Sequence, residues 1–269
     1  LAEELGTGEN LRDLSVSCIR LGGLYEKQEG HENLKKAESL YRRGLEINER
    51  LAEELGTGEN LRDLSVSCIR LGGLYEKQEG HENLKKAESL YRRGLEINER
   101  LAEELGTGEN LRDLSVSCSK LGKIYEKQGG RENLEKAEEL YRKSLGIKIR
   151  LLKEQGTGED LRDLSVGYER LGEVYERLGD RENLEKAEKM YEKSLEIRKE
   201  LAKELRTIAS YDDLAVGLYK VAAHPYTDPG KRKEYLAQMI AVSVSLYQQT
   251  RRPRYQQFIE TAGSLLRET

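Results

Sequence analysis

The sequence predicts an all-α protein, a right-handed α-solenoid in which antiparallel helix pairs stack one behind another and a C-terminal helix caps the stack. Three observations support this fold class. Residues 1–50 and 51–100 are identical, and the same 50-residue frame returns in 101–150, in 151–200 and more loosely in 201–250. Apolar residues recur at steps of three and four within each unit. Hydrophobic and charged residues each make up 36% of the chain, with 3 prolines, as in long helices around a thin core.

The first apolar stripe of each unit predicts a helix that we call helix A. In the first unit this stripe consists of Leu11, Leu14, Cys18, Leu21, Gly22 and Tyr25. We expect helix A to begin at Asn10, because its side chain can accept a hydrogen bond from a free backbone N–H of the first turn. Asp13 follows three residues later, where a negative charge favours the positive end of the helix. The later units hold comparable pairs, namely Asn60 and Asp63, Asn110 and Asp113, Asp160 and Asp163, and Ser210 and Asp213.

The second stripe predicts a longer helix B, which starts after Gly30 and crosses into the next unit. Its apolar positions are Leu34, Ala37, Leu40, Tyr41, Leu45, Leu51 and Leu55. They span roughly 22 residues, or about 33 Å at about 1.5 Å per residue. Gly6 and its counterparts Gly56 and Gly106 stand just past the predicted ends, where a residue with positive φ commonly terminates a helix.

Gly22 lies inside helix A, where a glycine costs about 1 kcal/mol relative to alanine. It returns as Gly72, Gly122 and Gly172 and becomes Ala222 in the fifth unit. A small residue kept at this position predicts that helices A and B touch backbone to backbone there.

The last 69 residues depart from the repeat. His224–Pro225 ends helix A of the fifth unit, and Asp228–Pro229 starts a new helix, because aspartate caps a helix and proline fits its first turn. After Pro253 a stripe predicts a final helix, with Tyr255, Phe258, Ile259, Ala262, Leu265 and Leu266 on its apolar side. The predicted domains are therefore residues 1–250 as helical repeats and residues 251–269 as a capping helix.

Small and aromatic residues recur at fixed places in each helix pair. The first unit has Leu21-Gly22-x-x-Tyr25, Ala37-x-x-x-Tyr41 and Gly44, and the fourth has Leu171-Gly172-x-x-Tyr175, Ala187, Tyr191 and Ser194. This pattern resembles the tetratricopeptide (TPR) repeat, strongly over residues 1–200 and weakly over 201–250. The usual repeat has about 34 residues. Both helices are longer here, which is similar to the long repeats of kinesin light chains and of bacterial TPR arrays.

The resemblance implies that helix A lines a concave groove, which binds a protein or a peptide. The implied contacts are Arg112, Ser119, Lys123, Lys127, Arg162, Glu169, Glu173, Arg177 and Tyr219. On this face the sequence of the third unit differs from that of the first. Either adaptation to a ligand or neutral drift of a surface would produce such differences. Because the fourth unit is acidic and residues 201–269 are basic, we expect a groove of mixed charge.

Composition and spacing argue against other kinds of site. The net charge is −4, from 46 basic and 50 acidic residues, so no field of one sign draws the chain to nucleic acid or to an anionic membrane. No apolar run reaches the roughly 20 residues that span a bilayer. Neither a catalytic set of nucleophile, base and orienting group nor a zinc-ligand spacing can be assembled, so we expect no enzyme activity, cofactor or metal.

The three cysteines, Cys18, Cys68 and Cys118, occupy one position in three successive units. Duplication therefore explains their spacing, and a disulfide framework does not. We expect them to be small buried residues and the protein to be cytoplasmic.

The sequence thus predicts a scaffold for protein or peptide partners, the docking or sensing arm of a larger signalling protein. The alternative is a structural spacer or self-assembling array, natural or engineered, which the two identical units favour. Residues 1–5 resemble the end of a helix B. We therefore expect the apolar edge of the first helix A to be open to end-to-end self-association, an edge that comprises Leu11, Leu14, Leu21 and Tyr25.

Overall fold

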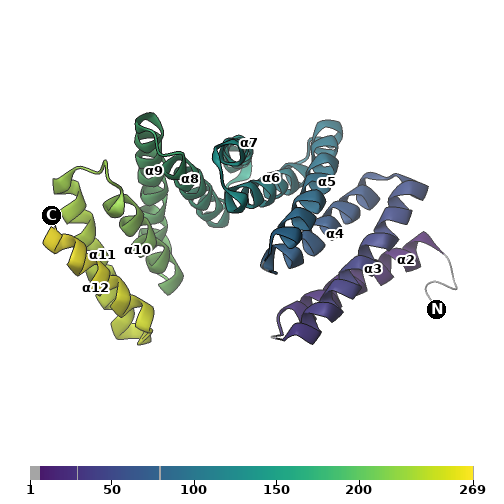
Figure 1. Ribbon diagram of the computed structural model, residues 1–269, viewed down its shortest axis with the longest axis horizontal. Helices are drawn as coiled ribbons and strands as arrows, with labels where there is room; N and C mark the ends of the chain where they lie inside the picture. The colour runs from purple at the N-terminus through teal and green to yellow at the C-terminus, as the bar shows by residue number, and fades with distance from the viewer. Residues whose placement is uncertain (1–6, 29, 79, 269) are drawn as a thin grey trace. The chain divides into compact units, whose positions relative to one another are not determined.

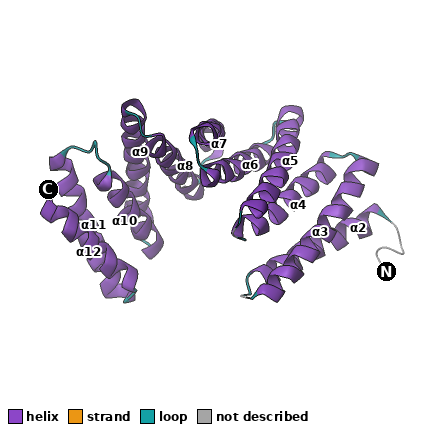
Figure 2. Cartoon of the chain, in the orientation of Figure 1, coloured by secondary structure: helices purple, strands orange, loops and turns teal. Residues whose placement is uncertain are grey.

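The computed structural model describes residues 7–28, 30–78 and 80–268, and these residues form only helices and connecting turns (Figure 2). The helix tail predicted at residues 1–5 lies outside this part. The chain divides into two compact units, Leu1–Ser144 and Leu145–Thr269. The all-α prediction is confirmed.

The first compact unit stacks helix pairs in chain order. Its helices are α2 (Gly8–Glu26), α3 (His31–Leu55), α4 (Gly58–Lys77), α5 (His81–Leu105), α6 (Gly108–Gln128) and the first part of α7 (Arg131–Gln155). The helices from α2 to α6 pack against one another in chain order, α2 on α3, α3 on α4, α4 on α5 and α5 on α6 (Figure 1). The helices α2, α4 and α6 also touch each other in turn, so successive copies of helix A lie side by side. Helix B is 25 residues long in α3, α5 and α7, slightly longer than expected.

The second compact unit continues the pattern and then departs from it. It holds the rest of α7 together with α8 (Gly158–Leu178), α9 (Arg181–Leu205), α10 (Ile208–Ala223), α11 (Pro229–Thr250) and α12 (Pro253–Glu268). The predicted boundary after α10 is confirmed, because Asp228 accepts the Lys231 N–H at 3.0 Å and Pro229 opens α11. The final helix is present as well, and α12 packs against α11 with Tyr255 and Ala262 fully buried.

The predicted start of helix A was wrong. The helix α2 begins at Gly8, and the Oγ1 of Thr7 accepts the backbone N–H of Asn10 at 3.4 Å. Asn10 is thus the third helical residue, and its N–H is one of those that need an acceptor. The same cap recurs at Thr57, Thr107, Thr157 and Thr207. At the last two, the side chains of Asp160 and Ser210 bond back to the threonine and complete a capping box.

Helix B ends as the sequence predicts. Gly56 and Gly106 terminate α3 and α5 in the left-handed conformation, with φ of 60° and 58°. Arg206 takes the same conformation at the end of α9, with φ of 51°. Arginine has a Cβ that disfavours this region, so glycine is the easier choice at the first two ends.

The predicted backbone-to-backbone contact at Gly22 was wrong, because a side chain and not a backbone lies against this glycine. The ring of Tyr41 covers this glycine, and a Cβ built on Gly22 would lie 2.8 Å from the ring carbon Cε1. The Tyr41 hydroxyl donates a hydrogen bond to Glu26 at 2.6 Å. The same stack recurs at Gly72 and Tyr91, Gly122 and Tyr141, and Gly172 and Tyr191. Between helices A and B, the nearest backbone atom to such a Cβ is found instead at Gly44, where a Cβ would be 3.4 Å from the Ser15 carbonyl oxygen.

The apolar edge of α2 is only partly open. Leu21 and Leu24 are 44% and 58% exposed. Leu11, in contrast, is buried against Ile47 and Leu51 of α3, so its predicted exposure was wrong.

The cysteines are buried, as predicted, with Cys68 and Cys118 fully inaccessible. Burial raises the pKa of both thiols to about 11, which keeps them protonated and unreactive at neutral pH.

Candidate functional site

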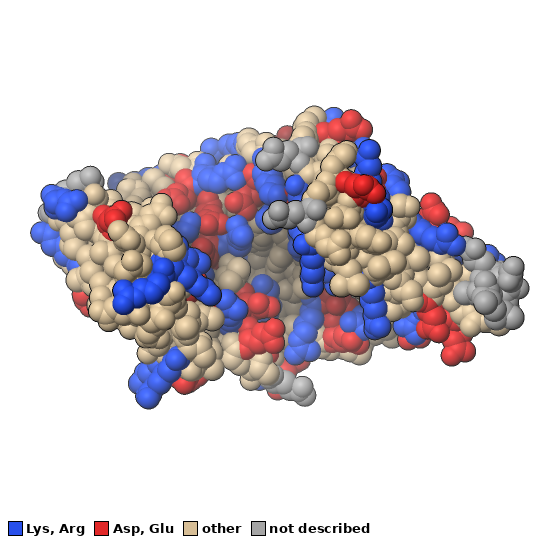
Figure 3. Space-filling model, turned by 90° about the horizontal axis from the view of Figure 1, so that it is seen from below, with Lys and Arg blue, Asp and Glu red and all other residues tan. Residues whose placement is uncertain are grey.

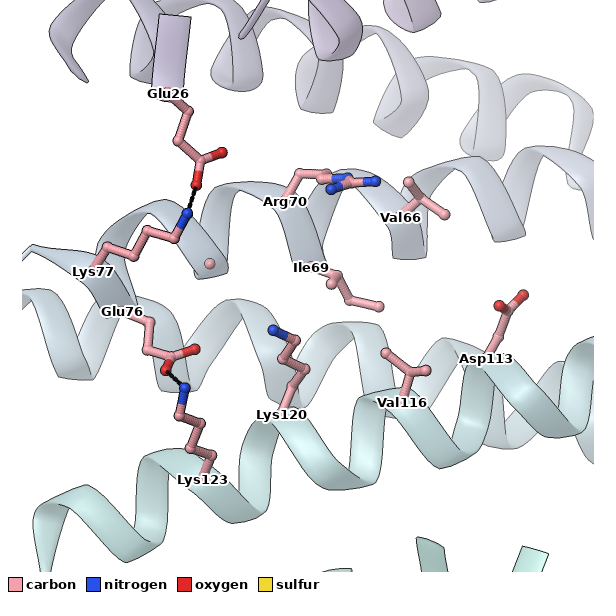
Figure 4. A pocket seen from close by; sticks show the side chains of 11 residues that line it. Glu26, Val66, Ile69, Arg70, Glu76, Lys77, Asp113, Val116, Lys120 and Lys123 are labelled. Atoms are coloured by element: carbon pink, nitrogen blue, oxygen red, sulfur yellow. Dashed lines mark hydrogen bonds and ion pairs between the residues drawn. The ribbon is translucent and has the colours of Figure 1, made fainter. Parts of the chain in front are cut away.

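The surface formed by successive copies of helix A is hollowed within the first compact unit. A depression of about 410 Å³ opens between α4 and α6, with Glu26 of α2 at one end; we call it the α4–α6 hollow (Figure 4). It is lined by Glu26, Val66, Ile69, Arg70, Gly73, Glu76, Lys77, Asp113, Val116, Lys120 and Lys123. A smaller hollow of about 220 Å³ lies one unit earlier and shares Val66 and Arg70 with it. The sequence therefore places apolar and charged side chains together in recesses along one face.

Glu76 is the most buried charge of the α4–α6 hollow, with 6% of its side chain exposed. Lys123 and Lys127 of α6 contact one of its oxygens at 2.7 and 2.9 Å, and the Tyr91 hydroxyl donates to the other at 2.9 Å. Burial alone would raise the pKa of Glu76, but the hydrogen bonds from the two lysines outweigh it and lower the pKa to about 2. This carboxylate therefore stays ionised and holds α4 to α6.

Glu26 forms a similar but simpler link one unit earlier. It pairs with Lys77 of α4 and accepts the Tyr41 hydroxyl (Figure 4). Burial opposes ionisation here too, and the hydrogen bonds from Lys77 and Tyr41 leave the pKa of Glu26 below its ordinary value.

Arg70 and Lys120 are different, because neither has a hydrogen bond or ion pair to any described residue. Lys120 extends from α6 into the space between the two helices, and Arg70 lies on the α4 side (Figure 4). Burial lowers the pKa of Lys120, and nearby Lys123, Lys77 and Arg70 lower it further, against an opposing effect of Glu76. The hollow thus contains two cationic groups whose charge is not met by a bonded acid.

The structure places two of the four predicted contacts of the third unit at this hollow. Lys123 lines it, and Lys127 reaches the same carboxylate of Glu76. Ser119 instead bonds Ser144 of α7 at 2.8 Å, and Arg112 is an exposed residue of α6. Lys123, Lys127 and Ser119 therefore hold helices together.

Most of the predicted contacts in the second compact unit also form internal pairs. Arg162 contacts Asp213 at 2.7 Å, and Glu173 contacts Lys220 of α10 at 2.7 Å. Glu169 pairs with Arg198 of α9, which is 4% exposed. Arg177 is exposed and Tyr219 is half-buried.

Links between neighbouring units follow fixed sequence offsets that the repeat pattern did not reveal. Arg12 contacts Asp63 and Arg62 contacts Asp113, both at 2.6 Å. Asn48 of α3 donates to the Ser67 hydroxyl at 2.8 Å. The sequence did contain a signal for the arginine–aspartate links. The period is 50 and each helix A lies beside the next copy of itself, so an arginine and an aspartate 51 residues apart in consecutive units can meet.

Charges of both signs are interspersed on the face shown in Figure 3. Among the described residues there is no cluster of three histidine, cysteine, aspartate or glutamate side chains that could hold a metal ion. No helix formed by these residues is long and apolar enough to cross a membrane.

Comparison with known proteins gives a structural likeness only. No protein-family model matches the sequence, and no curated protein does either. Among solved structures, BtubC (BKLC) from P. vanneervenii matches with a TM-score of 0.67 and 22% identity, over 91% of this chain and 86% of that one. A putative kinesin light chain from Podospora anserina, with nearly identical TPR-like repeats, has a TM-score of 0.60 and 19% identity, over 90% of this chain and 99% of that one.

A third similar structure is a signal transduction ATPase with numerous domains from Pyrococcus horikoshii, which carries a TPR sensor. It has a TM-score of 0.56 and 18% identity, over 96% of this chain but 33% of that one. At these identities the likeness concerns the fold. The chain has a TPR-like solenoid fold with a 50-residue period, as the sequence predicts.

Proposed function

We propose that this protein is a binding scaffold, which holds a peptide segment of a partner protein on the face formed by α2, α4 and α6. The observation that carries the proposal is the α4–α6 hollow, where Arg70 and Lys120 have no bonded acid among the described residues and lie beside aliphatic side chains. Concave sites with an apolar wall and a few unsatisfied polar groups are typical of ligand recognition. Catalysis has no support of this kind, so binding is the proposed activity.

The mechanism we propose is preorganisation. The walls of the hollow are held by Glu76 with its two lysines and by the paired Glu26 and Lys77. A bound segment would lose its own conformational freedom, but the receptor would lose little. TPR-like folds support protein partners in general, and the TPR sensor in the similar ATPase from P. horikoshii favours a docking or sensing arm within a signalling protein. Reduced, buried cysteines favour a cytoplasmic location.

A structural spacer or self-assembling array remains the second candidate, and one observation favours it. Several predicted contacts, among them Lys123, Glu173 and Arg162, pair with other residues of the same chain. Charges paired within the chain stabilise the stack of helices and contribute less to the binding of a ligand.

A displayed random peptide library, selected against this chain, tests the proposal. Val116→Trp fills the α4–α6 hollow without changing charge, and Val116 is already 45% exposed, so the fold should tolerate it. Leu105→Trp is the control, because Leu105 is 56% exposed and lies outside the hollow. We expect selected peptides to lose at least about tenfold in affinity for the first variant, the loss of one well-placed contact.

The control variant should bind the same peptides as the parent chain. Peptides that bind both variants equally would contradict the proposed face. Failure to select any peptide, together with mass that rises with concentration in light scattering, would favour the self-assembling array.

A further inference from the structure

We propose that the outward face of α2 is a docking surface for one amphipathic helix of a partner protein, a helix with the chemistry of α3. We call this surface the α2 end face; it consists of Asp13, Ser17, Leu21, Leu24 and Tyr25. None of these residues lines the α4–α6 hollow or the smaller hollow beside it. The inference therefore goes beyond the proposed function and concerns a separate site.

The structure shows how the same face is covered where it recurs in α4. Asn48 of α3 donates to the Ser67 hydroxyl at 2.8 Å and to the Asp63 carbonyl oxygen at 3.2 Å. The copy of this asparagine in α5 makes the same two bonds to α6, at 2.8 and 3.3 Å. Because both copies dock alike, the asparagine is a recurring part of the contact between a helix B and the next helix A.

A tyrosine of each receiving helix makes a second polar contact. The Tyr75 hydroxyl of α4 donates to Glu38 of α3 at 2.6 Å and accepts from Arg42. Arg92 of α5 donates to the Tyr125 hydroxyl of α6 at 2.8 Å in the same way. A helix that docks on such a face therefore carries a glutamate, an arginine four residues later and an asparagine ten residues after the glutamate.

The helix α2 has an identical set of receiving side chains, and its polar groups are unused in the described part of the chain. Ser17 is exposed, whereas its copy Ser67 is 1% exposed. Tyr25 is partly exposed, whereas its copy Tyr75 is 3% exposed. Among the described residues neither the Ser17 hydroxyl nor the Tyr25 hydroxyl has a hydrogen-bond partner. The groups that α3 meets on α4 are thus left on α2 for a ligand.

The apolar part of the α2 end face is exposed as well. Leu21 and Leu24 are 44% and 58% exposed, while their copies in α4 are 2% and 0% exposed. With Asp13 and Ser17 they follow steps of four, four and three, so the four side chains form one stripe along the helix. Covering the two leucines would remove apolar surface from water, which favours association. The stripe therefore suits a helix laid along α2.

A partner protein is the source of this helix that the structure favours. Among the described helices only α3 and α5 carry the glutamate, arginine and asparagine at this spacing, and both are already docked, on α4 and α6. A second copy of this chain could therefore supply one only by opening its own stack. The partner should also present an arginine near Asp13, because the copy of that residue, Asp63, pairs with Arg12 at 2.6 Å.

Fluorescence anisotropy with a labelled peptide of residues 31–55 tests the α2 end face on the full chain. This peptide carries Glu38, Arg42 and Asn48. We expect saturable binding of one peptide per chain. Leu24→Lys changes a side chain that is 58% exposed, so the fold should tolerate it, and it should weaken binding at least about tenfold. Leu105→Lys is the matched control, because Leu105 is 56% exposed and lies outside the α2 end face; it should bind as the parent chain does.

A double-mutant cycle tests the register of the docked helix. Asn48→Ala in the peptide should weaken its binding at least about threefold, the loss of one hydrogen bond. When the chain carries Ser17→Ala, the same change in the peptide should cost clearly less, because the hydroxyl acceptor is already gone. Losses that simply multiply would show that Asn48 does not meet Ser17 and would contradict docking in the manner of α3.

The absence of saturable binding, or equal binding by Leu24→Lys and the parent chain, would overturn the inference. A dimer of the chain alone in sedimentation equilibrium that Leu24→Lys abolishes would also overturn it, because the face would then belong to a second copy. Val116→Trp should leave the binding of this peptide unchanged, since Val116 lines the α4–α6 hollow and not the α2 end face. The two proposed sites can therefore fail independently of each other.

Discussion

The first two helix pairs have the same sequence but different surroundings. Leu21 and Leu24 of α2 are 44% and 58% exposed, whereas their copies Leu71 and Leu74 of α4 are 2% and 0% exposed. The helices around them differ, because α4 packs against both α3 and α5, whereas no described helix precedes α2. Identical residues thus belong to the surface in one copy and to the core in the next.

The polar links differ in the same way. Glu26 is bound by one lysine, Lys77, while its copy Glu76 is bound by both Lys123 and Lys127. The second lysine exists because the third unit has Lys123 where the second has Gly73. One substitution in a neighbouring unit therefore changes the environment of an otherwise identical carboxylate.

The largest expected difference between the two copies concerns leucine burial. Leu74→Ala should lower the free energy of unfolding by about 2 to 5 kcal/mol, because it removes a fully buried side chain and leaves a cavity. Leu24→Ala should cost less than about 0.5 kcal/mol, because that side chain is already largely in water. Urea unfolding followed by circular dichroism measures both values. Equal losses would mean that the two copies have the same surroundings in solution.

The second prediction compares two glycines of one helix pair, Gly72 in α4 and Gly94 in α5. A Cβ at Gly72 would lie 2.9 Å from the Tyr91 ring, whereas a Cβ at Gly94 meets no atom closer than 3.5 Å. Gly72→Ala should therefore destabilise the chain by about 1 to 3 kcal/mol through overpacking. Gly94→Ala should be neutral or stabilising by up to about 1 kcal/mol, because alanine favours a helix.

Thermal unfolding of the two variants provides the measurement. A larger substitution, Gly72→Leu, should separate α4 from α5 and lower the melting temperature further. A melting temperature unchanged by Gly72→Ala would show that the tyrosine ring moves aside at no cost.

The repeat pattern was enough to predict the helices, because their signals are local. Apolar spacing, the glycines after helix B and Asp228–Pro229 each act within a few residues. The N-cap was missed although Thr7 was available three residues before Asn10. A threonine followed three residues later by a polar side chain is itself a capping pattern, and Asp160 makes it explicit in α8.

The site could be predicted only in part, because it depends on which units meet. Lys123 was identified from its departure from the repeat, and it does line the hollow. Arg70 was not identified, because it is the exact copy of Arg20 and nothing in the sequence indicates that it lines a hollow together with Lys120. Side-chain pairing between units requires the offset of one helix A against the next, which a single sequence does not contain.

The smallest expected difference between the copies is one of pH dependence. The pKa of Glu76 is about 2 in the folded protein, against 4.5 for an unperturbed glutamate. Because the folded pKa is the lower one, ionised Glu76 stabilises the fold above about pH 4.5, and this stabilisation is lost as the pH falls toward about 2. Relative to Glu76→Gln, the parent chain should lose about 1 to 2 kcal/mol of stability over that range, a figure reduced for solvent screening.

Glu26→Gln is the matched control, and it should change the acid dependence less because Glu26 has one lysine where Glu76 has two. The variant Lys123→Ala tests whether the stronger acid dependence of Glu76 comes from its second lysine or from its deeper burial. If the second lysine causes the difference, this variant should give Glu76 an acid dependence close to that of Glu26. If Glu76 keeps its strong dependence without Lys123, then its deeper burial with Tyr91 and Lys127 is the cause, and the two copies differ through packing alone. Urea unfolding at a series of pH values between 2 and 6 distinguishes these outcomes, since the unfolding free energies diverge only where the carboxylates titrate.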